Sequence, residues 1–390
     1  MRKSINENRK IVIIRSFYPN PRMEKQAHTL ANHGYGVSLI GWERVSRSGA
    51  DNDDRLSRVR LLRLRVSPVS IKVAFYLPVW WLFIILQLFI ARWDVVHAID
   101  FESFVPSLIA AKIKRKRIIY DIADFFADNV QFPVLPNLTK RIIAKVDRAL
   151  MKFADAILIA NEPIIKHIGI STSNQPVAVI NNSPDPDILH KVSARILAHE
   201  GFTVYYGGWV YKNRGISDVC LAIKDLADVQ LIITGPCPQN FEVELQEVCR
   251  DIGNVTLHLG WIPHEEIVAR TVSADLLFAL YDPAITNNRY ASPNKLFEAM
   301  MCGKPIIVSD GSVMTDIVRE ENCGLVVPYG DINAIREAIL KLENNPELRQ
   351  SLAHNGRRAY ENRYSWRIME QRLLDIYQHI CNKRQIEAVP

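Results

Sequence analysis

The chain contains two successive series of short apolar segments, each separated from the next by a stretch with helical periodicity. Strands that are buried on both faces of a parallel sheet form such continuous Val, Ile and Leu runs, and helices supply the crossovers between them. The first series comprises 11–17, 34–42, 59–66, 93–100, 116–124, 154–161 and 176–181. The second comprises 202–208, 229–235, 255–261, 274–281, 304–310 and 324–330. We therefore expect two tandem, doubly wound, Rossmann-like α/β domains with a ligand cleft between them.

The segment 181–190 separates the two series and is rich in Pro, Asn and Asp, which is the composition of a linker. We place the first domain at 1–185 and the second at 186–365. The amphipathic tail 366–390 is expected to form a helix that packs back on the first domain. With 48% hydrophobic and 23% charged residues, the composition excludes a disordered chain and a small disulfide-stapled scaffold.

The two halves of the chain differ in charge. Residues 1–185 hold 27 Lys and Arg against 16 Asp and Glu, a net charge of +11, whereas residues 186–390 have a net charge of −5. A basic first half favours an anionic partner surface. Nucleic acid is disfavoured, because the basic residues border an apolar helix rather than interleaved stacking aromatics.

The segment 73–91 is uncharged and mostly apolar over 19 residues, which is only just long enough to cross a bilayer. Pro78 and Gln87 interrupt it, and its tryptophans prefer the membrane interface. Strand-like segments lie on both sides of it in the sequence, so a spanning helix would divide one sheet between the two faces of the membrane. We expect either a buried helix or, as we favour, a monotopic anchor, with the basic clusters 58–65 and 112–117 attracted to an anionic leaflet.

The six cysteines occur without Cys-x-x-Cys pairs, which excludes a zinc knuckle and a thioredoxin motif and favours reduced thiols. The polar start of the sequence indicates no signal peptide. These features predict a cytoplasmic protein attached peripherally to the cytoplasmic face of the membrane. The Asp185-Pro-Asp187 triplet looks like a metal-binding DxD motif, but its place in the linker favours a turn.

The loop after the first strand of the second domain has the residue types of a phosphate site. Gly207 and Gly208 end the strand, and Arg214 precedes the glycine at which the next helix begins. Glycines let backbone N–H groups approach a phosphate, and a guanidinium can clamp it. A GxGxxG fingerprint is absent here and after the first strand of the chain, so a nicotinamide dinucleotide is disfavoured.

A second set of anion-binding groups lies between residues 292 and 309. The start of a helix is formed there by Ser292, Pro293 and Asn294. Its free N–H groups and dipole attract an anion, and Lys295 adds a positive charge. Glu298 follows one turn later, where its carboxylate suits two sugar hydroxyls. This combination predicts a nucleotide-diphosphate site.

These motifs resemble those of the retaining glycosyltransferases of the GT-B fold, family 4, the "group 1" transferases. The likeness follows YYGG…RGI, LIITG, VTLHLGWIP, SADLLFALY and SPNKLFEAMMCGKPIIVS through the second domain. It is looser in the first domain, through NPRMEKQAHTLANHGYGV, WDVVHAID and IIYDIADFFAD. The resemblance implies a nucleotide-sugar donor on the second domain, an acceptor on the first, and neither a metal nor another cofactor.

By position in the family's motifs, Arg214 and Lys295 would bind the donor diphosphate and Glu298 the ribose, and we take these three as the catalytic set. Gly235, with Trp261 and Ile262, would flank the base. The remaining donor-binding positions implied by the resemblance are Gly207, Gly208, Ser292, Pro293 and Asn294. Acceptor-side candidates are Arg22, Lys25, His97, Asp100 and Asp124, with a structural role an equal alternative for His97.

The sequence departs from the family's pattern at three places. Tyr290 stands where the family often has the first carboxylate of a Glu-x7-Glu pair, and Ala123 stands where an active-site His is common. FYPNPR replaces the glycine-rich loop after the first strand. Substitutes for the missing carboxylate are Asp282, Asn287 and Asn288.

We therefore expect transfer of a hexose-type sugar from a UDP- or GDP-linked donor, with retention, to a lipid-linked or other membrane-associated glycan. The departures at Ala123 and Tyr290 favour an alternative, a catalytically silent GT-B protein that acts as a partner or scaffold for another transferase. Sugar-nucleotide epimerisation is disfavoured, because the YDIAD and SPNKLFE segments lack an acid/base set for it.

Overall fold

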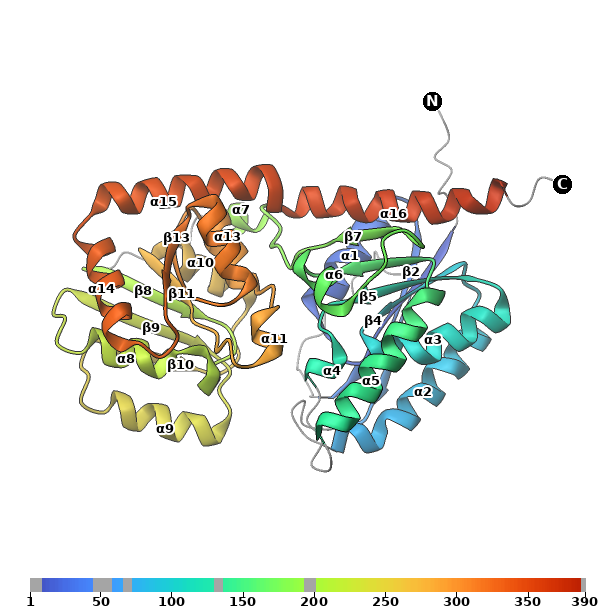
Figure 1. Ribbon diagram of the computed structural model, residues 1–390, viewed down its shortest axis with the longest axis horizontal. Coiled ribbons are helices and arrows are strands. Elements are labelled where there is room, and N and C mark those ends of the chain that lie inside the picture. The colour runs from blue at the N-terminus through green and yellow to red at the C-terminus, as the bar shows by residue number, and fades with distance from the viewer. Residues whose placement is uncertain (1–8, 45–57, 66–71, 130–135, 193–200, 387–390) are drawn as a thin grey trace. The chain divides into compact units, whose positions relative to one another are not determined.

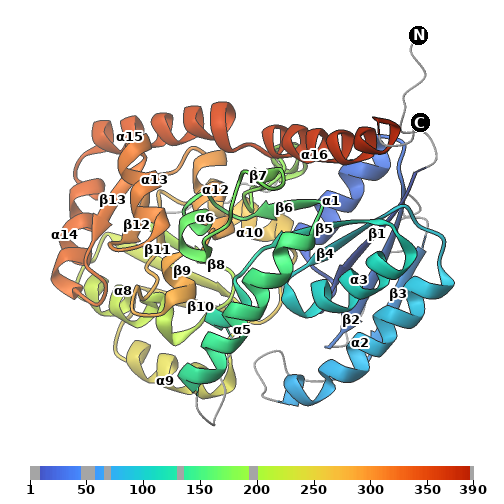
Figure 2. The same cartoon turned by 45° about the vertical axis from the view of Figure 1, so that its right-hand side comes forward.

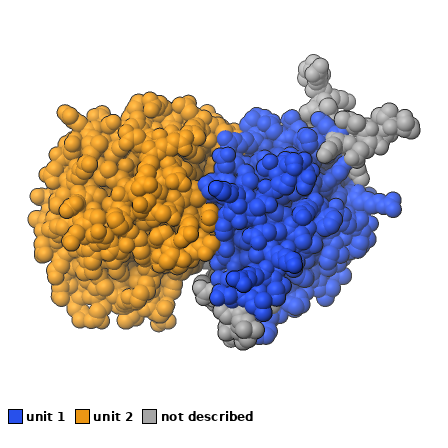
Figure 3. Space-filling model, viewed as in Figure 1, with its two compact units in different colours: residues 1–180, 370–390 blue, residues 181–369 orange. Residues whose placement is uncertain are grey.

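The structure of the protein is a computed structural model that describes residues 9–44, 58–65, 72–129, 136–192 and 201–386. The chain forms two compact units, distinguished by colour in Figure 3. Unit 1 comprises Met1–Ile180 and Glu370–Pro390, and unit 2 comprises Asn181–Met369. Each unit contains one parallel sheet with helices on its faces (Figures 1 and 2).

Unit 1 is built on a seven-stranded parallel sheet with the order β3-β2-β1-β4-β5-β6-β7. Its strands are β1 (Lys10–Arg15), β2 (Gly36–Glu43), β3 (Arg58–Arg63), β4 (Val95–Ile99), β5 (Arg117–Ile122), β6 (Ala156–Ile159) and β7 (Val177–Val179). The central strands β4, β5 and β6 are almost entirely buried, because helices cover both faces. Every apolar run of the first series forms a strand, as predicted.

The helices of unit 1 occupy the crossovers between these strands. They are α1 (Pro21–Asn32), α2 (Lys72–Ile90), α3 (Phe101–Lys114), α4 (Phe126–Asn129), α5 (Pro136–Leu150), η1 (Met151–Phe153) and α6 (Pro163–Ile168). Helix α1 begins where the Asn20 side chain accepts the backbone N–H groups of Arg22 and Met23 and Pro21 supplies a fixed φ. The last helix, α16 (Trp366–Ile386), joins unit 1 from Glu370 onward.

Helix α16 is held to unit 1 by buried contacts. The Tyr377 hydroxyl lies 2.9 Å from Nδ1 of His97 on β4, and its ring packs 5.7 Å from that of Tyr35. Arg9 donates to the carbonyl of Cys381 at 3.3 Å. The tail therefore completes the core of unit 1.

Unit 2 contains a six-stranded parallel sheet with the order β10-β9-β8-β11-β12-β13. Its strands are β8 (Phe202–Gly207), β9 (Val229–Gly235), β10 (Val255–Leu259), β11 (Leu276–Ala279), β12 (Ile306–Ser309) and β13 (Gly324–Val327). Its helices are α7 (Ile188–Val192), η3 (Lys212–Arg214), α8 (Ile216–Ile223), α9 (Gln239–Cys249), α10 (His264–Ser273), α11 (Thr286–Arg289), α12 (Asn294–Met301), α13 (Val313–Glu321), α14 (Ile332–Glu343), α15 (Pro346–Ala359) and η4 (Tyr360–Tyr364). The order reverses between β8 and β11, which is the switch point at which doubly wound sheets bind ligands.

Helix α2 has two different sides. Trp80, Ile84 and Leu88 are fully buried against the unit, whereas Phe75 and Ile90 are 78% and 73% exposed. Helix α3 lies beside α2 in both views (Figures 1 and 2). Of the helices that the structure describes, none is long and apolar enough to span a membrane.

Candidate active site

Two glycine-containing loops meet at the carboxyl ends of β8 and β9. Gly208 (φ +122°) and Gly235 (φ +139°) occupy backbone conformations that disfavour other residues, and a Cβ on Gly235 would lie 2.1 Å from the Gly208 carbonyl oxygen. A Cβ on Gly208 would lie 2.9 Å from Nζ of Lys295. A Cβ on Gly207 would lie 2.7 Å from the Ile267 side chain. Only glycines let these loops approach each other and the lysine so closely.

Arg214 is held at this edge of the sheet by an aromatic ring and an amide. Its guanidinium carbon lies 3.5 Å from the centre of the Tyr281 ring, and Nη1 donates to Oδ1 of Asn288 at 2.9 Å. Asn288, on α11, is itself fixed because its amide donates to the Asp282 carbonyl at 3.1 Å. Gly215 (φ +61°) turns the chain from Arg214 into α8. The guanidinium is therefore preorganised without being neutralised by a carboxylate.

Lys295 provides the second positive charge. It lies in the first turn of α12, is 9% exposed, and places Nζ 4.3 Å from the centre of the Tyr206 ring. Burial acts to lower the pKa of this ammonium, but the Tyr206 and Tyr281 hydroxyls and the Glu298 carboxylate outweigh that effect and raise it. The Lys295 side chain is accordingly charged at neutral pH.

Glu298 lies one turn after Lys295 on α12 and is 4% exposed. His264, at the start of α10, places Nε2 2.8 Å from Oε1 of Glu298. The His264 side chain is 48% exposed, so the pair extends from the buried carboxylate to the surface. His264 thus fixes one carboxylate oxygen of a residue predicted to bind ribose.

The other donor-side candidates surround these three residues. Ser292 and Pro293 precede α12, the Ser292 carbonyl accepts from the Asn182 amide at 3.0 Å, and Asn294 is exposed at the first helical position. Trp261 is 61% exposed in the loop that follows β10, and Ile262 beside it is half-buried.

This arrangement has the chemistry of an anion site beside a hydroxyl-binding carboxylate. Among the residues that the structure describes, no carboxylate lies within ion-pair distance of Arg214 or Lys295. Rings and an amide hold both cations, so their charge is available to a bound anion. In the described part of the chain, no three His, Cys, Asp or Glu side chains come together as a metal site.

Two of the acceptor-side candidates in unit 1 are interior residues. Arg22 forms a double hydrogen bond to Asp121, with its Nη2 and Nε 2.7 and 3.0 Å from the carboxylate oxygens. His97 is fully buried, with Nε2 3.3 Å from the same carboxylate. Burial would raise the pKa of Asp121, but Arg22 and His97 hold it well below its ordinary range. Of the two roles expected for His97, the described contacts favour the structural one, because this network encloses its ring.

Asp100 ends β4 in a strained conformation, with φ +63° and ψ +160°. Its carboxylate accepts the backbone N–H groups of Ala123 and Asp124 at 3.1 and 3.3 Å and forms an ion pair with Arg15 at 3.0 Å. Burial, opposed by Arg15, raises the pKa of Asp100 to about 7. Asp124 and Lys25 are half-buried. Ala123 therefore contributes a backbone N–H, in place of a side chain, to the carboxyl edge of this sheet.

The residues that sequence reasoning missed are the partners of those it found. His264 follows the WIP motif, and Asn288 was considered only as a substitute for a missing carboxylate. Asn288 instead positions Arg214. Asp121, in the YDIAD segment, was missed altogether. Only long-range packing brings these residues to Glu298, Arg214 and Arg22, so no local spacing could identify them.

The fold has close counterparts among solved structures. Sucrose-phosphate synthase from Thermosynechococcus elongatus aligns with a TM-score of 0.74 at 18% identity, covering 95% of this chain and 99% of that chain. Anabaena HepE in complex with UDP aligns with a TM-score of 0.68 at 15% identity, covering 95% and 100%. The two parallel sheets and the C-terminal helix define a GT-B fold.

Sequence comparison finds a family likeness in the second half of the chain. The profile described as "Glycosyl transferases group 1" matches residues 193–359, which lie within unit 2. The capsular polysaccharide biosynthesis glycosyltransferase CapM of Staphylococcus aureus is 26% identical over 46% of this chain and 47% of its own length. A GDP-mannose-dependent monoacylated alpha-(1-6)-phosphatidylinositol monomannoside mannosyltransferase of Corynebacterium glutamicum is 29% identical over 39% of each chain. The matched regions thus span less than half of these relatives, and the likeness to the group 1 glycosyltransferases covers residues 193–359 of this chain.

Proposed function

We propose that this protein transfers a sugar from a nucleoside diphosphate sugar, with retention at the anomeric carbon, to a membrane-associated glycan acceptor. The observation that carries the proposal is the placement of Arg214 and Lys295 at the carboxyl edge of the unit 2 sheet, uncompensated by described carboxylates and next to Glu298. A diphosphate satisfies both cations, and a ribose satisfies the carboxylate.

In this proposal the two cations stabilise the negative charge that develops on the departing nucleoside diphosphate. Preorganised charges in a partly buried site lower a barrier in this way without reorganising during the reaction. Lys295 and Arg214 take the place of a divalent metal, so the reaction is proposed to be metal-independent. Glu298, fixed by His264, orients the donor through its ribose.

The acceptor class is inferred from unit 1 and from the relatives. CapM acts in capsular polysaccharide biosynthesis, and the Corynebacterium enzyme acts on a phosphatidylinositol mannoside, by their descriptions. Exposed apolar side chains follow one side of α2 at helical spacing, namely Phe75, Val79, Leu82, Leu86 and Ile90. Helix α3 next to it ends in exposed Lys112, Ile113 and Arg115. We infer that this side of unit 1 lies in an anionic membrane interface, without spanning the membrane.

The cytoplasmic side of the membrane is the proposed location. All six cysteines are free thiols, although the sulfur atoms of Cys220 and Cys249 lie only 3.6 Å apart. Thiols at this distance persist unpaired in a reducing compartment, which supports this location.

A thermal-shift screen of the purified protein against UDP-, GDP- and dTDP-sugars tests the donor site. A ligand bound only by the folded state stabilises it by about 2.7 kcal/mol at a hundredfold excess over its dissociation constant. We expect a shift with one base, and loss of that shift in Glu298→Ala. Transfer of labelled sugar to membrane lipid extracts, with and without EDTA, then tests acceptor class and metal independence.

The alternative of a catalytically silent scaffold rests on Ala123 and Tyr290. Ala123 presents only its backbone N–H to Asp100, and Tyr290 ends α11 with no carboxylate at that position. The absence of a shift with every donor, together with retained partner binding in Glu298→Ala, would favour this alternative over transfer.

A further inference from the structure

A basic pocket lies at the opposite end of the unit 1 sheet from Asp100. It has a volume of about 280 Å³ and lies against the face formed by the first residues of β1, β2 and β3. Across these strands Val12 pairs with Ser38 and Ser38 with Arg58, so the three side chains form a row on one face. Because the carboxyl ends of the strands lie at the other edge, this pocket is separate from the proposed acceptor groups of unit 1.

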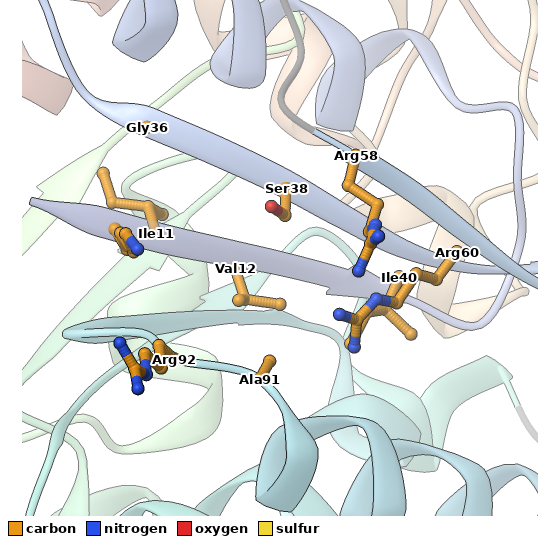
Figure 4. Close-up of a pocket in the computed structure, with 10 residues that line it drawn as sticks. Ile11, Val12, Gly36, Ser38, Ile40, Arg58, Arg60, Ala91 and Arg92 are labelled. Atoms are coloured by element: carbon orange, nitrogen blue, oxygen red, sulfur yellow. The ribbon is translucent and has the colours of Figure 1, made fainter.

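Four cationic residues line the pocket: Lys10, Arg58, Arg60 and Arg92. Figure 4 shows Arg58 and Arg60 projecting from β3 over Ser38 and Ile40, with Arg92 on the other side. No carboxylate among the described residues forms an ion pair with any of the four. Asp94 accepts the Lys10 backbone N–H at 3.1 Å and is paired with Lys116 at 3.0 Å.

The positive charge of the pocket is concentrated, and the described residues around it leave it without an ion-paired carboxylate. Arg60 donates to the side-chain oxygen of Gln87 on α2 at 2.7 Å. Gln87 is neutral, so this hydrogen bond leaves the charge of Arg60 in place. Burial and then the charge of Arg58 lower the pKa of Arg60, in keeping with two guanidinium groups on neighbouring positions of one strand face. A phosphate group, which accepts several charge-assisted hydrogen bonds, is the ligand that such a set of donors fits.

The position of the pocket indicates where that phosphate comes from. Ala91 and Arg92 of the pocket directly follow α2, and Ile90 and Phe89 at the end of that helix are 73% and 43% exposed. An apolar helix side that ends at a basic pocket places acyl chains and a headgroup phosphate at adjacent points, as in basic headgroup sites of membrane proteins. A free phosphate would need only the pocket and not the apolar side.

We propose that this pocket binds the phosphate of an anionic phospholipid headgroup and so fixes the orientation of unit 1 on the membrane. The inference rests on the proposed membrane contact of α2 and adds to it a defined headgroup site. In this proposal Arg58 and Arg92 contact the phosphate from two sides, and the hydrogen bond from Arg60 to Gln87 joins β3 to α2 beside the pocket. The apolar side of α2 accommodates the first carbons of the acyl chains.

The test is co-sedimentation of the full chain with vesicles of phosphatidylcholine containing phosphatidylglycerol. The variant Arg58→Gln/Arg92→Gln removes two exposed guanidinium groups without removing a described hydrogen bond. The control Arg63→Gln/Arg65→Gln removes the same charge outside the pocket, together with the exposed ion pair of Arg63 to Glu43. Each cation near an anionic surface changes partitioning by about fivefold. We expect the pocket variant to bind at least about tenfold more weakly than the control.

Two further arms identify the ligand. Vesicles made equally anionic with oleic acid, which carries a carboxylate, should bind the two variants alike, each more weakly than the wild type because each lacks two cations. Equal binding of the wild type to the two kinds of anionic vesicle, or equal loss in both variants, would overturn a phosphate site in favour of general surface charge. Saturation of the pocket by soluble glycerol phosphate with undiminished vesicle binding would overturn the lipid source. A donor-induced thermal shift should be unchanged in the pocket variant, so failure of this inference is distinct from failure of the proposed transferase function.

Discussion

The arginines at the carboxyl edges of the two sheets are held in opposite ways. In unit 1, Arg15 and Arg22 form ion pairs with Asp100 and Asp121 at 3.0 and 2.7 Å. In unit 2, Arg214 is held by the Tyr281 ring and the Asn288 amide, and Lys295 lies over the Tyr206 ring. The two sheets therefore have similar topology, but the cationic side chains at their carboxyl edges have different partners: carboxylates in unit 1, and aromatic rings and an amide in unit 2.

The difference separates structural charge from functional charge. A buried guanidinium already paired with a carboxylate has little attraction left for a ligand, and removal of either partner leaves a costly buried charge. A guanidinium held by a ring and an amide retains its full charge. We infer that unit 2 is organised to receive an anion, whereas the buried charges of unit 1 hold its strands and α1 together.

The strongest test of this comparison is the pair Arg214→Ala and Arg22→Ala. In the proposed reaction Arg214 stabilises the leaving group, so in Arg214→Ala kcat for sugar transfer should fall by about 10²–10³-fold. Its free energy of unfolding should fall by about 1–3 kcal/mol, less than in Arg22→Ala, because the buried Asn288 oxygen loses a hydrogen bond but no buried charge is left unpaired. Initial-rate kinetics with the donor found in the thermal-shift screen, together with denaturant unfolding, measures both effects.

Arg22→Ala is the mirror case. It leaves Asp121 buried and without its double hydrogen bond, which costs about 3–5 kcal/mol of unfolding free energy. If Arg214→Ala and Arg22→Ala lost similar unfolding free energy and similar kcat, the distinction between the carboxyl edges of the two sheets would be wrong.

The fold was predictable because its signal is local. Each of the thirteen strands in the part of the chain that the structure describes coincides with an apolar run that is visible in the sequence, and the helical stretches between the runs predict the parallel crossovers. The relative position of Lys295 and Glu298 was predictable for the same reason, because the two residues lie one turn apart on a single helix.

The pairing of charges was not predictable in the same way. Arg22 and His97 were taken as acceptor-side candidates because they follow or end strands, yet both are turned into a network around Asp121. Sequence position gives the edge of the sheet but not the direction of a side chain. That direction depends on partners far along the chain, such as Tyr377 on α16.

A second, smaller effect is expected from pH and belongs to unit 1. Asp147 on α5 is buried beside the Tyr120 hydroxyl, and burial raises its pKa to about 7. The folded state therefore holds a proton that the unfolded state releases above about pH 4. The stability contributed by this proton is complete at low pH and is lost as the pH rises through about 7.

Asp147→Asn removes this titration and keeps an oxygen that accepts from Tyr120. Between pH 5.5 and pH 8.5, the melting temperature of the wild type should fall relative to that of the variant by about 4–8 °C. The roughly 1.5 pH units between 5.5 and the pKa of Asp147 correspond to about 2 kcal/mol, and 1 kcal/mol shifts the melting temperature of a unit of this size by about 2–4 °C. Differential scanning fluorimetry at the two pH values measures the gap. Parallel pH profiles for the two proteins would show that Asp147 is ionised in the folded state already at pH 5.5, and that buried carboxyls of unit 1 do not set its pH response.

The smallest expected effect concerns His264, which fixes Oε1 of Glu298 at 2.8 Å. In His264→Ala the carboxylate stays on α12 but loses this partner. We expect the dissociation constant of the donor to rise about two- to tenfold, the range for loss of one hydrogen bond, with kcat little changed. The matched control is His258→Ala, because His258 is exposed on β10 in the same unit. Isothermal titration with the donor compares the two variants. A loss of kcat as large as that of Arg214→Ala would place His264 in the chemistry rather than in ribose binding, and equal affinities for both His variants would show that Glu298 needs no such support.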